Sequence, residues 1–113
     1  MKEILQQWRA QALLDALPDP LSGKERYVEP FESGDVSLGL YAPRGTDDQE
    51  PHDKDEFYFV ISGSGRFVHG DNNTAFGPGD ALFVPAGQVH RFEDFDDDFA
   101  AWVVFWEPRD DHA

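Results

Sequence analysis

A chain of 113 residues with a formal net charge of −14 and no cysteine excludes several classes of protein. Nucleic-acid binding needs clustered Lys and Arg, and 9 such residues stand against 23 acidic ones, so we expect no nucleic-acid partner. Disulfides, Cys-bound zinc and thiol catalysis are excluded, so a metal would need His, Asp, Glu, Asn or Gln as ligands.

The apolar content indicates one folded domain that is not embedded in a membrane. Hydrophobic residues make up 40% and aromatic residues 14% of the chain, which is enough for a core at this length. The longest apolar run, 99–106, is too short to span a bilayer. The first 17 residues lack the unbroken apolar core of a signal peptide. We therefore expect a cytoplasmic protein without a membrane partner.

The first element in the chain is a predicted helix over residues 3–17. Its apolar residues recur with a period near 3.6, and Pro18 and Pro20 end the pattern. The apolar side chains are Ile4, Leu5, Trp8, Ala12, Leu13 and Leu17. We expect this face to pack either on the rest of the domain or on a partner chain.

From residue 26 the pattern changes to short β-forming runs separated by Gly, Pro, Asn and Asp turns. Turn signals every 8–12 residues or so indicate an all-β barrel or sandwich. We divide the chain into a helix and lead-in, 1–20, and a single β domain, 21–113. The predicted strands are 26–31, 36–42, 56–62, 66–70, 81–87, 88–95 and 99–107.

Two histidines and a carboxylate stand at the starts of different predicted strands. His52 precedes Glu56 by four residues, and Glu50 shares their parity along an extended chain. His90 follows the turn 85–87 and begins another strand. Two imidazoles and one carboxylate suit divalent iron, manganese, nickel or zinc. The pattern therefore predicts a metal site if these strand ends converge.

The chain resembles the cupins in two motifs, at residues 50–65 and 79–94. The first motif usually reads His-x-His, three or four residues, Glu, six residues, Gly. The second reads Gly, five residues, Pro-x-Gly, two residues, His, three residues, Asn. Two positions differ, because Glu50 stands at the first His and Asp94 at the Asn. The matching positions are His52, Glu56, Gly63, Gly79, Pro85, Gly87 and His90.

The resemblance, which covers roughly residues 35–106, implies a fold and a ligand set. The fold would be the cupin jelly roll, or double-stranded β-helix barrel, all-β with a short N-terminal helix. His52, Glu56 and His90 would hold one divalent metal ion per chain. The fourth ligand would be Glu50, or else the neighbouring Gln49. Cupins are usually homodimers, so a homodimer is the expected assembly.

The function that follows belongs to one of two classes. The first is a metal-dependent enzyme of the oxygenase, isomerase or lyase type, acting on a small organic molecule, with Glu56 as the catalytic carboxylate. The alternative is a non-catalytic module that binds a small ligand or a metal. A purely structural metal is a weaker reading, because structural zinc usually uses Cys. Tyr58 and Arg66 are both candidates to line a pocket, and Asp94 to orient a ligand histidine.

Overall fold

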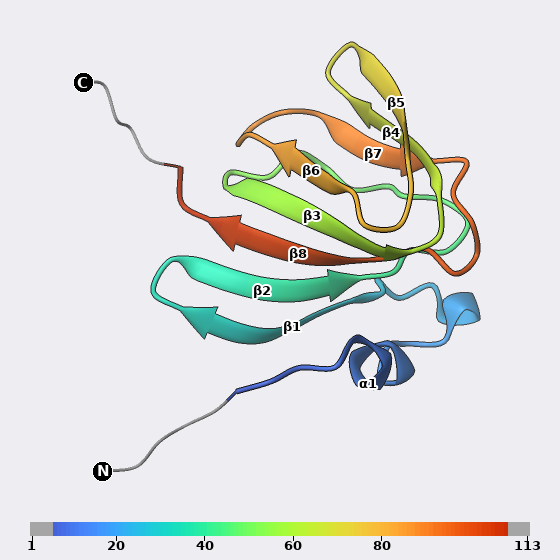
Figure 1. Cartoon of the computed structure of the whole chain (residues 1–113), viewed down its shortest axis with the longest axis vertical. Coiled ribbons are helices and arrows are strands. Elements are labelled where there is room, and N and C mark those ends of the chain that lie inside the picture. The colour runs from blue at the N-terminus through green and yellow to red at the C-terminus, as the bar shows by residue number, and fades with distance from the viewer. Residues whose placement is uncertain (1–5, 109–113) are drawn as a thin grey trace.

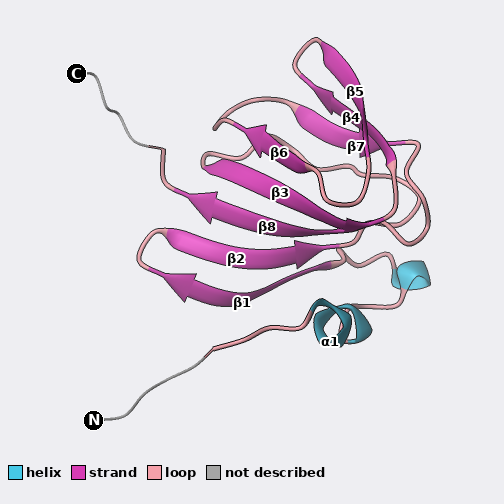
Figure 2. Cartoon of the chain, in the orientation of Figure 1, coloured by secondary structure: helices cyan, strands magenta, loops and turns pink. Residues whose placement is uncertain are grey.

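The computed structural model of the chain describes residues 6–108, which form two antiparallel sheets and one short α-helix (Figures 1 and 2). One sheet has the strand order β1-β2-β8-β3-β6 and the other β5-β4-β7. The strands are β1 Tyr27–Ser33, β2 Val36–Tyr41, β3 Asp55–Ser62, β4 Gly65–His69, β5 Asn72–Phe76, β6 Ala81–Val84, β7 His90–Glu93 and β8 Ala100–Trp106. The predicted all-β jelly-roll fold is confirmed.

Alternation along the strands places one set of side chains between the two sheets. On β3, Glu56, Tyr58 and Val60 are buried, whereas Phe59 between them is exposed. On β7, His90 and Phe92 face inward. The inward positions of β3 and β7 therefore carry the polar side chains of the site as well as core residues.

Aromatic rings fill the space between the sheets. Phe92 packs against Phe99 with ring centroids 4.6 Å apart and meets Tyr58 edge to face at 4.9 Å. Phe67 and Phe76 complete this cluster around Phe92, at 5.1 Å and 5.3 Å. Large buried rings supply most of the apolar area in a small domain, so this cluster is the main source of its stability.

The N-terminal helix is shorter than the sequence predicts. Residues 3–5 lie outside the described part of the chain, and α1 covers only Ala10–Asp15. Arg9 at the N-cap is extended and makes no side-chain capping bond, and residues 6–8 before it are not helical. Trp8 instead packs on Phe31 of β1 with ring centroids 5.1 Å apart.

The apolar face of α1 packs on the outer surface of the larger sheet. Leu13 and Leu14 contact a small cluster formed by Leu40, Ala42 and Ala100. Of the two expected positions for this helix, the structure shows the one on the barrel. In the part of the chain that the structure describes, no helix is both long and apolar enough to cross a membrane.

The glycine of the first motif has a steric reason. Gly63 adopts a positive φ of 77°, and a Cβ there would lie 2.6 Å from Cα of Phe99. Asp94 also adopts a positive φ, 52°, a conformation in which Asp is tolerated better than most residues. The exposed Asp94 therefore meets a backbone requirement of the turn after β7.

Candidate metal centre

The structure brings His52, Glu56 and His90 together. One nitrogen from each imidazole and one carboxylate oxygen all lie within 4.8 Å of one another. Nε2 of His90 is 2.8 Å and Nε2 of His52 is 3.8 Å from Oε1 of Glu56. Within residues 6–108 this is the one group of three or more His, Asp or Glu side chains arranged in this way.

Backbone contacts between the two motifs hold the histidines in place. The N–H of Gly87 donates to the carbonyl of His52 at 2.7 Å. The N–H of Ala86 donates to Oδ1 of Asp55, the first residue of β3, at 2.8 Å. The turn between β6 and β7 is therefore attached to the loop that enters β3. Because His90 begins β7 just after this turn, its ring faces Glu56 on β3.

The ring of His90 is oriented by a backbone carbonyl. Nδ1 lies 2.9 Å from the carbonyl oxygen of Gln88, so Nδ1–H donates and Nε2 faces Glu56. A neutral imidazole held in this way presents its free lone pair to a metal. The Gln88 carbonyl thus orients the ligand histidine, the role for which Asp94 was a candidate.

The environment of the Glu56 carboxylate shows whether this group of residues fits a cation. Its carboxylate is fully buried, and neither oxygen has a hydrogen bond of good geometry, although His90 lies close to Oε1. Its nearest polar neighbours are the two imidazoles, which supply a counter-charge only when protonated. A buried carboxylate left without a counter-charge costs on the order of several kcal/mol of free energy. A divalent ion between the carboxylate and the two imidazoles would remove this cost, so the donor set fits a metal.

Electrostatics around the cluster follow from burial and from the nearby carboxylates. Burial is the largest influence on His90 and opposes its positive charge, but hydrogen bonding to Glu56 and Gln88 outweighs it, so the pKa of His90 is raised. Burial, followed by the charges of Glu56 and Asp47, raises the pKa of Tyr58 well above its usual value. Tyr58 therefore keeps its proton and donates to Oε1 of Gln49 at 3.0 Å.

The two candidates for the fourth ligand lie in different places. Glu50 is exposed and does not belong to the group formed by the two histidines and Glu56. Gln49 is half-buried, and its Oε1 lies 3.2 Å from Nε2 of His52. Thus Gln49, and not Glu50, directs an oxygen toward the cluster.

Asp47 fixes the position of Gln49, and the sequence gives no sign of this role. Its buried carboxylate accepts hydrogen bonds from Nε2 of Gln49 at 2.6 Å and from the N–H of Phe92 at 2.8 Å. The hydroxyl of Tyr41 and the N–H of Gln49 donate to its other oxygen. Asp48, identical in type and next in sequence, is exposed.

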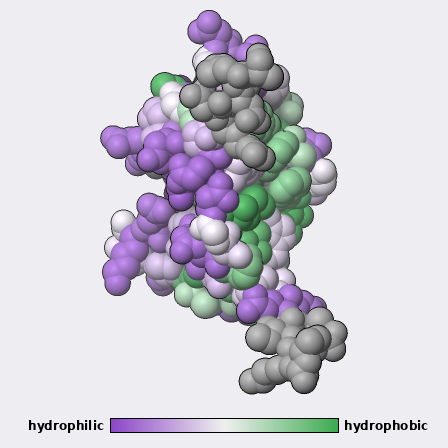
Figure 3. Space-filling model, turned by 90° about the vertical axis from the view of Figure 1, so that its left-hand side faces the viewer, coloured by the Kyte–Doolittle hydropathy of each residue, from purple (hydrophilic) through white to green (hydrophobic). Residues whose placement is uncertain are grey.

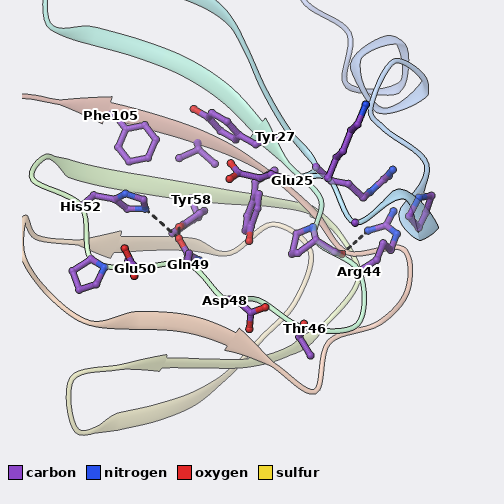
Figure 4. A pocket seen from close by; sticks show the side chains of 18 residues that line it. Glu25, Tyr27, Arg44, Thr46, Asp48, Gln49, Glu50, His52, Tyr58 and Phe105 are labelled. Atoms are coloured by element: carbon purple, nitrogen blue, oxygen red, sulfur yellow. Dashed lines mark hydrogen bonds between the residues drawn. The ribbon is translucent and has the colours of Figure 1, made fainter.

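A pocket of about 910 Å³ opens on the cluster. Figure 4 shows His52, Gln49, Tyr58 and Phe105 at one end of it. Glu56 and His90 are almost fully buried and do not line it. Of the two residues considered for a pocket, Tyr58 lines it, whereas Arg66 is exposed and donates to Asn73.

This chain belongs to the cupin family. The Cupin domain family matches residues 37–106, which include both motifs and the three clustered side chains. The barrel and the two motifs predicted from the sequence agree with this assignment.

Two proteins with similar sequences differ in how much of their length this chain covers. An uncharacterised protein of Streptomyces coelicolor is 38% identical over 85 residues, covering 74% of this chain and 81% of that protein. A dimethylsulfoniopropionate lyase of Ruegeria pomeroyi, DddQ, is 35% identical over 72 residues, but this chain spans only 33% of its length.

Solved structures show the same barrel. The structure of that lyase superposes with a TM-score of 0.65 at 25% identity, covering 87% of this chain and 53% of the lyase. A Klebsiella pneumoniae protein with a double-stranded β-helix domain gives a TM-score of 0.70 at 18% identity, covering 91% of this chain and 90% of that one.

Proposed function

We propose that this cupin is a metal-dependent enzyme that acts on a small organic molecule. His52, Glu56 and His90 would hold one divalent ion, with iron, manganese, nickel and zinc as the candidates. The observation that carries the proposal is the buried carboxylate of Glu56, which accepts no hydrogen bond of good geometry and faces two imidazoles beside a pocket. A purely structural ion would not require this pocket.

Gln49 is our proposed fourth ligand, in place of Glu50. Support comes from its oxygen beside His52 and from the Asp47 carboxylate that holds its amide nitrogen. A neutral amide in this position would leave the site with one carboxylate. Such a set of two imidazoles and one carboxylate is typical of sites with open positions for substrate or dioxygen.

The roles of the chain's own residues follow from their positions. When bound, the ion would supply Lewis-acid polarisation of a substrate oxygen. Tyr58 and Gln49 present polar atoms to the pocket, while Phe105 packs edge to face on His52, with ring centroids 5.2 Å apart. Because Glu56 is fully buried, we assign it to holding the metal, and its action as a base stays a prediction.

Among oxygenase, isomerase and lyase chemistry, we propose the lyase type. Support comes from the likeness to the dimethylsulfoniopropionate lyase in sequence and in structure. The alternative is a non-catalytic binding module, and the likeness to that lyase covers only a third of the lyase's length.

A turnover assay separates the enzyme from the binding module. Metal-loaded protein would be incubated with dimethylsulfoniopropionate and with other small β-substituted carboxylic acids, and substrate loss followed by proton NMR. We expect elimination with at least one of them, reduced by a factor of 100 or more in Glu56→Gln, because the metal or base is lost. Glu32→Gln, at an exposed residue outside the pocket, is the matched control and should keep the wild-type rate. Absence of turnover across the panel would support the binding module.

We also propose that a second copy of the chain covers the outer face of β3, β6 and β8. Phe57, Phe59, Phe83 and Trp106 form an aromatic patch there, with neighbouring ring centroids 5.2–6.1 Å apart. Phe59 and Phe83 are 42% and 46% exposed, unusually high for large apolar rings in contact. Figure 3 shows hydrophobic surface gathered along one side of the molecule.

Charges beside the patch suit a two-fold contact between copies. Lys54 and Glu107 lie 3.7 Å apart next to Trp106, so across a two-fold axis each could face the oppositely charged side chain of the other copy.

Light scattering should give about twice the chain mass of 12.8 kDa for wild type. Phe59→Lys should give the monomer, and Val89→Lys, at an exposed residue outside the patch, should not. A monomeric wild type would contradict the proposal.

A further inference from the structure

Cationic side chains gather at the end of the pocket away from His52. Arg44 and the neighbouring Arg26 lie at this end, and together with Lys24, which also lines the pocket, they make up three of the nine Lys and Arg residues in a chain of net charge −14. Figure 4 shows Arg44 across the pocket from His52. A protein this acidic repels anions at long range, so a local cationic wall is an exception within it.

Two of these side chains are held side by side by one backbone oxygen. Nε of Arg26 donates to the carbonyl of Ala42 at 2.9 Å, and Nη1 of Arg44 donates to the same oxygen at 3.3 Å. Nη1 of Arg44 also donates to the carbonyls of Pro43 and Phe99, both at 2.9 Å. The two guanidinium groups are therefore fixed in orientation before any ligand arrives.

The positive charges of this pair are not neutralised by a direct partner. Among residues 6–108, no carboxylate oxygen lies within 4.0 Å of either guanidinium, and the Lys and Arg ion pairs are formed elsewhere, by Lys54 and Arg91. Burial and the nearby charge of Arg26 lower the pKa of Arg44, while Asp97 and Asp98 act in the opposite direction from farther away. Two adjacent, half-buried guanidinium groups without a counter-ion favour binding of an anion.

Some N–H groups of the two guanidinium groups remain available to a ligand. The carbonyl contacts of Arg44 use only Nη1, and those of Arg26 use Nε and Nη1, the latter directed at Pro18. In the described part of the chain, Nε and Nη2 of Arg44 and Nη2 of Arg26 donate to no other group. Planar guanidinium groups of this kind match the two oxygens of a carboxylate.

We propose that Arg26 and Arg44 form a binding site for the carboxylate of a small organic acid, at the end of the pocket away from the cluster at His52. This anion site needs neither the metal nor the proposed enzymatic function. A monoanion is favoured over a phosphate, because Glu25, Asp48 and Glu50 line the same pocket and would repel a second negative charge.

The test uses the full-length chain labelled with ¹⁵N and observes the side-chain Nε–H signals of its arginines by NMR. Propionate, propionamide and inorganic phosphate are titrated at constant ionic strength with sodium chloride. We expect propionate to shift the signals of Arg26 and Arg44 saturably and to leave that of Arg66 unchanged. Propionamide should shift none of them. Stronger binding of phosphate than of propionate would overturn the carboxylate assignment, and equal shifts in all three arginines would overturn the site.

Variants then separate ligand binding from support of the loop. Arg44→Gln should weaken propionate binding by roughly tenfold or more, as expected for loss of a charged hydrogen bond. Arg44→Lys should keep part of the affinity because it keeps the charge, and Arg66→Gln is the control. Unchanged affinity in a folded Arg44→Gln protein would refute the proposal.

The titration is repeated after the metal has been removed by a chelator and the chelator dialysed away. We expect the same shifts, because the arginine pair is separate from the histidines. Loss of propionate binding on metal removal would overturn the arginine site and place the carboxylate on the metal. Persistence of binding in a protein that takes up no metal would uphold this inference while the proposed enzymatic function fails.

Discussion

Replacement of Asp47 by alanine tests whether one buried carboxylate organises the pocket side of the site. The carboxylate accepts four hydrogen bonds, from the Tyr41 hydroxyl, the N–H of Gln49, Nε2 of Gln49 and the N–H of Phe92. Hydrogen bonds to a charged group each contribute about 1.5–3 kcal/mol, and a buried N–H left unpaired costs about 1–3 kcal/mol. Part of this is recovered because the loop can move and admit water.

We therefore expect Asp47→Ala to lower the free energy of unfolding by about 3 kcal/mol. For a domain of this size the midpoint of thermal unfolding should fall by roughly 10–15 °C. Asp48→Ala is the matched control, because this neighbour is exposed, and should change stability by no more than about 0.5 kcal/mol. Urea unfolding followed by circular dichroism measures both. A stability of Asp47→Ala equal to that of Asp48→Ala would refute the reasoning.

Two further changes test the packing of the barrel. Gly63→Ala should destabilise the protein more than Gly34→Ala. Both glycines have a positive φ, but only at Gly63 would an added Cβ meet backbone, 2.6 Å from Cα of Phe99. Strain of this kind costs about 1–3 kcal/mol, and equal denaturation midpoints for the two variants would contradict the steric account. Phe92→Ala should cost about 3–5 kcal/mol, because the ring is buried at the centre of the aromatic cluster. Leu21→Ala, at a side chain 94% exposed, serves as its control, and similar losses for both would show that the cluster is not the main core.

The strands and the ligand cluster were predictable because both depend on local spacing. Alternation in 56–62 places Glu56 and Tyr58 on the inward face, and the turn before His90 begins the strand that carries it. The short strand β5, Asn72–Phe76, was not predicted, because Asn72 and Asn73 have the composition of a turn but pair with β4. The predicted length of the N-terminal helix was wrong, since Trp8 lies before α1 and packs on Phe31 of β1.

The supporting residues of the site depend on contacts that sequence spacing does not encode. Asp47 and Asp48 look alike in the chain, yet only Asp47 meets the N–H of Phe92, a residue 45 positions away. The sequence left Gln49 and Glu50 open as ligands, and the path of the loop directs only Gln49 toward His52. The arginine pair was not foreseen either, because the carbonyl that joins Arg26 and Arg44 lies at the end of β2.

Elemental analysis of the purified protein tests the metal centre most directly. The protein would be prepared without chelator or added metal, beside the double variant His52→Ala/His90→Ala, with circular dichroism to confirm that both are folded. The account predicts close to one divalent ion per wild-type chain, before or after reconstitution with iron or manganese, and almost none in the double variant. Equal metal content in the two proteins, or no uptake by the wild type, would contradict the assignment of His52, Glu56 and His90 as a metal site.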